Sequence, residues 1–105
     1  MKKNIAILGS TGSIGINTLK VIDRYRDQFN VVALTAYQNS DLLVEQARKY
    51  APKYVAATDE NIGQLRKRLN SGKIKVCSVD HDLSMIASLP EVDVVVLAMR
   101  GSAAL

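Results

Sequence analysis

The chain has 105 residues, of which 48% are hydrophobic and 23% are charged, and its formal net charge is +4 at pH 7. This length fits a single domain, and the share of apolar residues excludes a chain that is disordered throughout. Aromatic residues amount to only 5% and the basic residues form no continuous stripe, so the composition argues against a protein that binds nucleic acid. No apolar run is long enough to cross a membrane, and residues 4–8 are too few for the core of a signal peptide.

The chain has one cysteine, Cys77, so no internal disulfide can form, which fits a protein of the cytoplasm. Cys77 lies in an apolar run, and we expect a buried small side chain there rather than a nucleophile. The single histidine, His81, stands between Asp80 and Asp82 in a polar turn. We interpret this segment as a solvated turn in which Asp80 caps the following helix, because the spacing does not suit metal ligation from one helix face.

The predicted elements alternate between short apolar runs and amphipathic segments. In chain order, the first half predicts a strand at residues 4–9, a helix from Ser13 to about Tyr25, a strand at residues 29–36, and a helix that is capped by Asn39 or Ser40 and stopped by Pro52. The second half predicts a strand at residues 53–58, a helix with Thr58 as its N-cap, a strand at residues 74–79, a short helix closed by Pro90, and a strand at residues 92–98.

The predicted strands are nearly continuous apolar runs without polar alternation, which is typical of a parallel sheet covered by helices on both faces. We therefore predict an α/β fold with a doubly wound, mostly parallel, Rossmann-like sheet of five strands in the order 3-2-1-4-5. Residues 1–105 are expected to form one NAD(P)-binding domain. Since the usual dinucleotide fold has a sixth strand, we expect the chain to be a fragment that ends before a catalytic region.

The glycine spacing at residues 7–15, which read ILGSTGSIG, indicates the strand-to-helix turn of a dinucleotide site. Gly9 allows the sharp turn at the strand end, Gly12 lets a pyrophosphate approach the backbone, and Gly15 lets the helix pack closely on the strand. The start of a helix offers unpaired N–H groups and the positive end of its dipole to phosphates. A tight turn that binds nothing remains the alternative.

Hydroxyl groups between these glycines are expected to add donors for the phosphate oxygens. They belong to Ser10, Thr11 and Ser13. The segment is not a P-loop, because no Gly-Lys-Ser/Thr follows it.

The end of the second predicted strand carries no acidic residue, and the nearest acid, Asp41, already belongs to the next helix. An acid at this point would hold the ribose hydroxyls of NAD and repel a 2′-phosphate, so its absence favours NADP. No Arg or Lys stands there either, and Gln38 and Asn39 would donate uncharged hydrogen bonds. Tyr37 would either stack on adenine or cover the sheet edge, and both interpretations stay open.

The stretch ILGSTGSIGINTLKVI resembles the opening of the 1-deoxy-D-xylulose 5-phosphate reductoisomerase family. The likeness continues in order through FNVVALTA, VEQARKYAPKYVA and VDVVVLAMRGSAAL, and so covers the whole chain. The resemblance implies an NADPH-dependent oxidoreductase that isomerises 1-deoxy-D-xylulose 5-phosphate and reduces the product to 2-C-methyl-D-erythritol 4-phosphate, in the non-mevalonate route of isoprenoid biosynthesis. It also implies a cytoplasmic homodimer that needs magnesium or manganese.

By position in the family motif, the residues expected to meet the NADPH phosphates are Thr11, Gly12, Ser13 and Ile14, and those expected at the adenosine 2′-phosphate are Tyr37, Gln38 and Asn39. Tyr37 and Gln38 stand where the family more often has a glycine and a basic or small polar residue. Arg100 and Ala104 replace an apolar residue and a glycine. The family's metal-binding and substrate-binding residues lie beyond Leu105, so no catalytic or metal residue is assigned and the chain alone is expected to be inactive.

Two other functions fit part of the pattern. An extended short-chain dehydrogenase or epimerase also uses Gly-x-x-Gly-x-x-Gly, but it would show an acid after the second strand and a later Tyr-x-x-x-Lys, and neither is present. The other alternative is a non-catalytic nucleotide-binding or interaction domain.

Overall fold

The computed structural model describes residues 2–69 and 72–98. Its strands are β1 (Lys3–Leu8), β2 (Phe29–Thr35), β3 (Tyr54–Ala57), β4 (Lys75–Ser78) and β5 (Val94–Leu97). Its helices are α1 (Ser13–Arg24), α2 (Ser40–Tyr50), α3 (Asp59–Arg68) and α4 (Leu83–Ala87). The alternation predicted from the sequence is therefore confirmed. The family departures at Arg100 and Ala104 lie outside the described residues.

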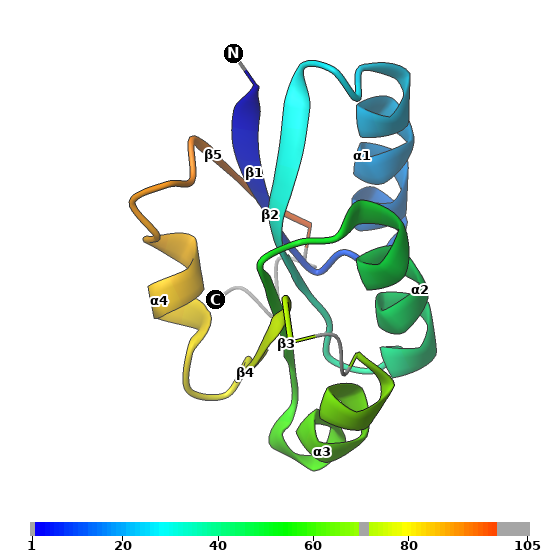
Figure 1. Ribbon diagram of the computed structural model, residues 1–105, viewed down its shortest axis with the longest axis vertical. Coiled ribbons are helices and arrows are strands. Elements are labelled where there is room, and N and C mark those ends of the chain that lie inside the picture. The colour runs from blue at the N-terminus through cyan, green and yellow to red at the C-terminus, as the bar shows by residue number, and fades with distance from the viewer. Residues whose placement is uncertain (1, 70–71, 99–105) are drawn as a thin grey trace.

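All strand pairs in the sheet are parallel, and the strand order is β4-β3-β2-β1-β5 (Figure 1). The predicted doubly wound, Rossmann-like fold is confirmed, as are the run β3-β2-β1 and the return of the chain to the far side of β1. The difference is that β4 extends the sheet beyond β3, where Val76 and Cys77 pair with Val55 and Ala56. Apolar patterning identifies a strand but does not specify which open edge of the sheet it joins.

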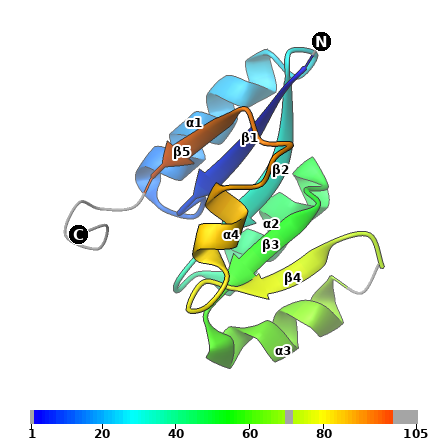
Figure 2. The same cartoon turned by 90° about the vertical axis from the view of Figure 1, so that its left-hand side faces the viewer.

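The helices cover the sheet unequally. Figures 1 and 2 show α1 and α2 on one face and α4 on the other. The larger core cluster joins the sheet to α1, α2 and α3, and includes Leu19, Leu43 and Leu65. The smaller cluster lies under α4 and centres on Ile86. Right-handed crossovers explain this division, because β1 to β4 advance in one direction and the step back to β5 reverses it.

The strand at the β5 edge is more exposed than its apolar sequence predicts. Full burial between two helix layers was expected, but Val94, Val95 and Leu97 are 38%, 36% and 63% exposed. Within the described residues, β5 pairs only with β1, so one of its edges has no neighbouring strand. Among the described residues, these three side chains of β5 therefore remain partly open to solvent.

The predicted N-cap residues agree with the structure for two helices, α2 and α3, and differ for one, α4. Asn39 is the N-cap of α2, where its Oδ1 accepts a hydrogen bond of 3.1 Å from the Leu42 N–H. Thr58 occupies the N-cap position of α3 as predicted, although its side chain makes no capping bond. Asp82, and not Asp80, precedes α4.

The first helix leans so closely on the first turn that only glycine fits at position 15. A Cβ on Gly15 would lie 2.4 Å from the carbonyl oxygen of Gly9 and 2.5 Å from the Cα of Ser10. Because both neighbours are backbone atoms, neither can turn away as a flexible side chain would. The predicted role of Gly15 in close packing is confirmed.

Replacing Gly15 by alanine therefore tests the packing of α1. We expect Gly15→Ala to lower the free energy of unfolding by about 2 kcal/mol or more, because backbone atoms must move. Gly63→Ala is the matched control, since Gly63 lies inside α3 with nothing within 4 Å of the added methyl group. The control is expected to raise stability by about 0.5–1 kcal/mol, through helix propensity. Equal effects of the two changes in urea denaturation would contradict the packing account.

Candidate functional site

The turn between β1 and α1 is fixed to the end of β2. Gly9 has a φ of +93°, in the region that favours glycine, and its N–H donates to Thr35 Oγ1 over 3.0 Å. The next N–H, of Ser10, donates to the Thr35 carbonyl oxygen over 2.8 Å. One residue of β2 thus holds two consecutive amides, and the loop leaves the sheet in a defined direction.

The hydroxyl of Ser10 is not available to a ligand, which corrects the expectation that it donates to a phosphate. Ser10 is fully buried, and its Oγ donates to Oε1 of Gln46 over 2.7 Å. In return, Nε2 of Gln46 donates to the Ser10 carbonyl oxygen over 2.9 Å. Of the other two hydroxyl residues, Thr11 is half-buried and Ser13 is exposed.

Among the described residues, no side chain caps the start of α1, and the Gly12 N–H donates to the Gly9 carbonyl oxygen over 3.3 Å. Its N-cap, Gly12, has no side chain to cap the helix, and the first turn contains no acidic residue. The other two long helices among the described residues have an acceptor or a negative charge at their N-termini. Asn39 caps α2, and the first turn of α3 contains two acids, Asp59 and Glu60. The positive dipole end of a helix start without a carboxylate favours an anion.

Neither the backbone angles of Gly12 nor its contacts with the described residues require a glycine at this position. Its φ of −79° and ψ of 173° suit any residue, and among residues 2–69 and 72–98 an added Cβ would meet ordinary contacts, 3.7 Å from the Gly9 oxygen and 3.8 Å from the Ala98 oxygen. Gly12 is also exposed. A ligand that comes close to the backbone does require a glycine here, so the residues present fit a diphosphate.

The second predicted set, Tyr37, Gln38 and Asn39, lies at the same edge of the sheet. Leu8, the last residue of β1, pairs with Thr35, the last residue of β2, so both loops leave side by side. All three side chains are exposed, with Tyr37 at 39%. The capping bond of Asn39 uses its acceptor Oδ1 and not its amide N–H groups. The structure therefore brings the two predicted groups of residues together.

The end of β5 completes this edge. Leu97 pairs with Leu8 on the side opposite to β2, and the Ala98 N–H donates to the Leu8 carbonyl over 2.8 Å. The chain runs outward from β1 to β2 on one side and returns as β5 on the other. In doubly wound proteins, ligands bind outside the carboxyl ends of the strands at such a switch point.

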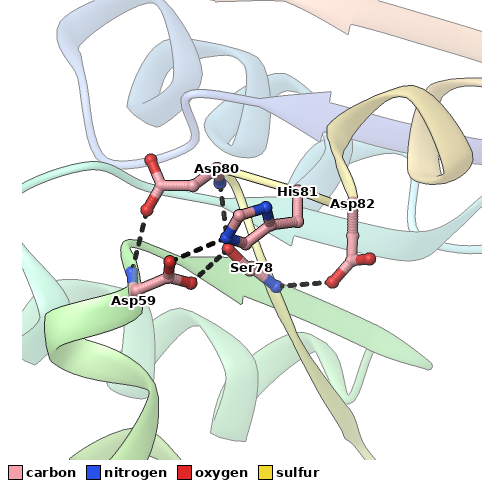
Figure 3. Close-up of polar contacts among 5 residues, drawn as sticks. All are labelled: Asp59, Ser78, Asp80, His81 and Asp82. Atoms are coloured by element: carbon pink, nitrogen blue, oxygen red, sulfur yellow. Dashed lines mark hydrogen bonds and ion pairs between the residues drawn. The ribbon is translucent and has the colours of Figure 1, made fainter.

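A hydrogen-bonded group of polar residues stands at the carboxyl ends of β3 and β4 (Figure 3). Asp59 accepts from Ser78 Oγ over 2.6 Å through one carboxylate oxygen, and contacts Nε2 of His81 at 2.9 Å through the other. Asp80 accepts from the Asp59 N–H over 3.0 Å, and Asp82 accepts from the Ser78 N–H over 2.9 Å. These bonds join the start of α3 to the turn after β4.

The polar group is a capped turn, as interpreted from the sequence, but with different partners. The carboxylate of Asp80 serves α3 instead of the helix that follows it. His81 is exposed as expected, and its contact with Asp59, 22 residues away, could not be foreseen from spacing. Among residues 2–69 and 72–98, no three His, Cys, Asp or Glu side chains are grouped so that they could hold a metal ion.

The thiol of Cys77 is buried in β4, and the prediction of a small core side chain is confirmed. Burial raises the pKa of the Cys77 thiol, and the nearby Asp82 carboxylate adds to the effect. A thiol that resists ionisation is a poor nucleophile.

The residues that sequence reasoning missed are Thr35 and Gln46, which shape the loop without belonging to it. Gln46 did carry a signal: it is a polar residue within the buried face of α2, beside Leu43, Ala47 and Tyr50. Buried polar groups are nearly always hydrogen-bonded, so a glutamine at a core position implies a specific partner.

Known proteins match the chain along most of its length. Residues 5–105 match the family model described as 1-deoxy-D-xylulose 5-phosphate reductoisomerase. Curated proteins of that name from Phocaeicola vulgatus and Methylococcus capsulatus are 47% and 49% identical over 106 and 107 residues, covering 100% and 98% of this chain but 28% and 27% of the relatives. A crystal structure of DOX-P reductoisomerase in complex with NADPH, fosmidomycin and magnesium superimposes with a TM-score of 0.92 at 34% identity, over 98% of this chain and 26% of that one.

None of the described helices has the length and apolar character needed to cross a membrane.

The Asp59 carboxylate gives a pH test of the polar group. The hydrogen bond from Ser78, and then the contact with His81, lower the pKa of Asp59 below its ordinary value of 3.8. A lowered pKa contributes stability that is present above the ordinary value and is lost as the pH falls through the folded value. We therefore expect Asp59→Asn to be less stable than the wild type at neutral pH, with the difference shrinking below about pH 4.

Thermal denaturation at a series of pH values measures this difference. Glu60→Gln, which removes one exposed negative charge from the same helix turn, is the control for net charge. A gap between Asp59→Asn and wild type that stays constant down to pH 3 would show that the Asp59 contacts do not stabilise the fold through its charge.

Proposed function

Because the chain belongs to the 1-deoxy-D-xylulose 5-phosphate reductoisomerase family, we propose that residues 1–105 form the NADPH-binding domain of an oxidoreductase with that activity. The chain spans 28% and 27% of the length of the two curated relatives described above, so this activity is proposed for the full-length protein that carries it. Two alternatives, an extended short-chain dehydrogenase or epimerase and a non-catalytic nucleotide-binding domain, are less well supported. Neither accounts for the family match over residues 5–105.

One observation supports this proposal most strongly: α1 starts without a side-chain cap, behind a glycine that no contact among the described residues requires. Gly12 is exposed, its backbone angles suit any residue, and an added Cβ would have room among the neighbours that the structure describes. Diphosphate binding explains both features, since the oxygens must come within hydrogen-bond distance of the main chain. In this proposal the amides and hydroxyls that hold the diphosphate belong to Thr11, Gly12, Ser13 and Ile14.

The adenosine end of the cofactor is assigned to the loop after β2. Tyr37, Gln38 and Asn39 are exposed there, beside the first loop, and no acid of this loop would repel a 2′-phosphate. Gln38 and Asn39 would donate amide hydrogen bonds to that phosphate. When bound, NADPH supplies the hydride for reduction, and this chain's own residues bind and orient it.

The remaining functional assignments rest on family membership. We propose that the full-length protein reduces a phosphosugar, uses magnesium or manganese bound by residues outside this chain, and forms a homodimer. The solved relative in complex with NADPH, fosmidomycin and magnesium supports the cofactor and the metal of this proposal. The single buried cysteine fits a cytoplasmic protein, and the lack of a basic stripe fits one without a nucleic-acid partner.

The Gly12→Ala variant separates cofactor binding from folding. We expect NADPH affinity to fall at least tenfold, about 1.4 kcal/mol, because the methyl group occupies the approach to the amides. The free energy of unfolding should stay within about 0.5 kcal/mol of the wild type, since the nearest contacts of the new Cβ are 3.7 Å or longer. NADPH fluorescence titration and urea denaturation measure the two quantities. Unchanged affinity in a folded variant would remove the main support for the proposed site.

The loop after β2 is tested by comparing two cofactors. We expect the wild type to bind NADPH at least tenfold more tightly than NADH. Gln38→Lys supplies the missing cation and should tighten NADPH binding by about fivefold while leaving NADH unchanged, because only NADPH carries the 2′-phosphate. Gln64→Lys, an exposed position on α3, is the control for added positive charge. Equal tightening of both cofactors by Gln38→Lys would place the 2′-phosphate elsewhere.

A further inference from the structure

The buried amide of Gln46 has an unusual position. Gln46 is only 7% exposed, and it lies on α2, whereas its partner Ser10 lies in the loop before α1. The two residues are 36 positions apart and exchange two hydrogen bonds, from Ser10 Oγ to Oε1 over 2.7 Å and from Nε2 to the Ser10 carbonyl oxygen over 2.9 Å. No buried side-chain N or O atom among the described residues lacks a partner, so this amide is satisfied.

Core packing alone does not require an amide at this position. The neighbouring buried residues of α2 are mostly apolar, including Leu43, Val44 and Ala47, and an apolar side chain of similar size would fill the same space. A buried amide is costly unless its hydrogen bonds are made, so its geometry is tightly constrained. The hydrogen bonds of Gln46 therefore restrain the backbone of the loop at Ser10, which an apolar residue would not do.

The feature that Gln46 fixes is the orientation of one peptide plane. The carbonyl of Ser10 shares its peptide unit with the N–H of Thr11, and the described chain contains no cis peptide bond. In a planar trans peptide the carbonyl and the N–H point in opposite directions. Because Nε2 of Gln46 holds the Ser10 carbonyl toward the buried side of the loop, the Thr11 N–H faces away from it.

We propose that Gln46 is a positioning residue that presents the Thr11 amide to the cofactor diphosphate. The inference rests on the proposed function, since it names how a residue of α2 prepares the loop that would bind the cofactor. Thr35 fixes the preceding amides of Gly9 and Ser10, and Gln46 fixes the next peptide along the chain. The diphosphate is common to NADPH and NADH, so Gln46 acts on both cofactors equally, unlike a residue at the 2′-phosphate.

The test replaces Gln46 by methionine in the full-length protein that carries this chain. Methionine keeps an unbranched apolar shape but cannot donate to the Ser10 carbonyl. We expect Gln46→Met to weaken NADPH and NADH binding by the same factor, about tenfold or more, as for loss of one charge-assisted hydrogen bond. Ser10→Ala is the matched control, because it removes the other hydrogen bond of the pair and leaves the Nε2 donor in place. It should weaken binding by about threefold at most.

The outcomes separate this inference from the proposed function. Wild-type protein that fails to bind NADPH contradicts the proposed function. Wild-type binding together with unchanged affinity in Gln46→Met, or a loss for NADPH alone, overturns only the role of Gln46. If the Gln46→Met substitution unfolds the protein, a measurement on the wild type still tests the inference. In selectively ¹⁵N-threonine-labelled wild type, the Thr11 amide signal should shift on addition of NADPH and also of NADH, and a signal that stays in place with either would overturn the inference.

Discussion

Two consecutive amides of the first loop converge on Thr35, and the rest of the site depends on this contact. The Gly9 N–H bonds to Thr35 Oγ1 and the Ser10 N–H bonds to its carbonyl oxygen. Since Thr35 is the last residue of β2, the loop after β1 is tied to the point where the second loop begins. The contact fixes where α1 can start, so its uncapped amides open at the carboxyl edge of the sheet.

The surrounding elements hold the loop after β1 in place. Gly15 lets α1 rest on the loop backbone, Gln46 holds the loop from α2, and Thr35 holds it from β2, so three elements contact residues 9–10. The carboxyl end of β5 closes the other side, next to Leu8. Because such support already orders the loop, its main-chain amides can bind an anion with little further loss of conformational entropy.

The sequence was sufficient for the parts of the site that depend on backbone shape. The glycine spacing predicted the turn, the start of α1 and the close packing at Gly15, because each requires a residue without a Cβ. It did not predict the direction of the Ser10 side chain, since a hydroxyl in a loop can face either the ligand or the core. The partner that decides this, Gln46, lies 36 residues away.

The sequence also failed to predict two other long-range contacts, the strand that pairs with β4 and the helix that Asp80 caps. The strand at residues 75–78 was recognised, but its neighbour depends on which sheet edge the chain reaches, and it joined β3. Asp80 was expected to cap the helix after it, yet its carboxylate caps α3, because the turn after β4 lies beside the start of that helix. In both cases local propensity was correct and the tertiary partner was missing.

The central claim is that the main-chain amides at the start of α1 bind a diphosphate. A crystal structure of the full-length protein with NADPH tests it most directly. The account expects diphosphate oxygens at about 3 Å from the backbone nitrogens of Thr11, Gly12, Ser13 or Ile14. A structure in which NADPH binds without contacting these amides, or in which they hold no cofactor at saturating NADPH, would contradict it.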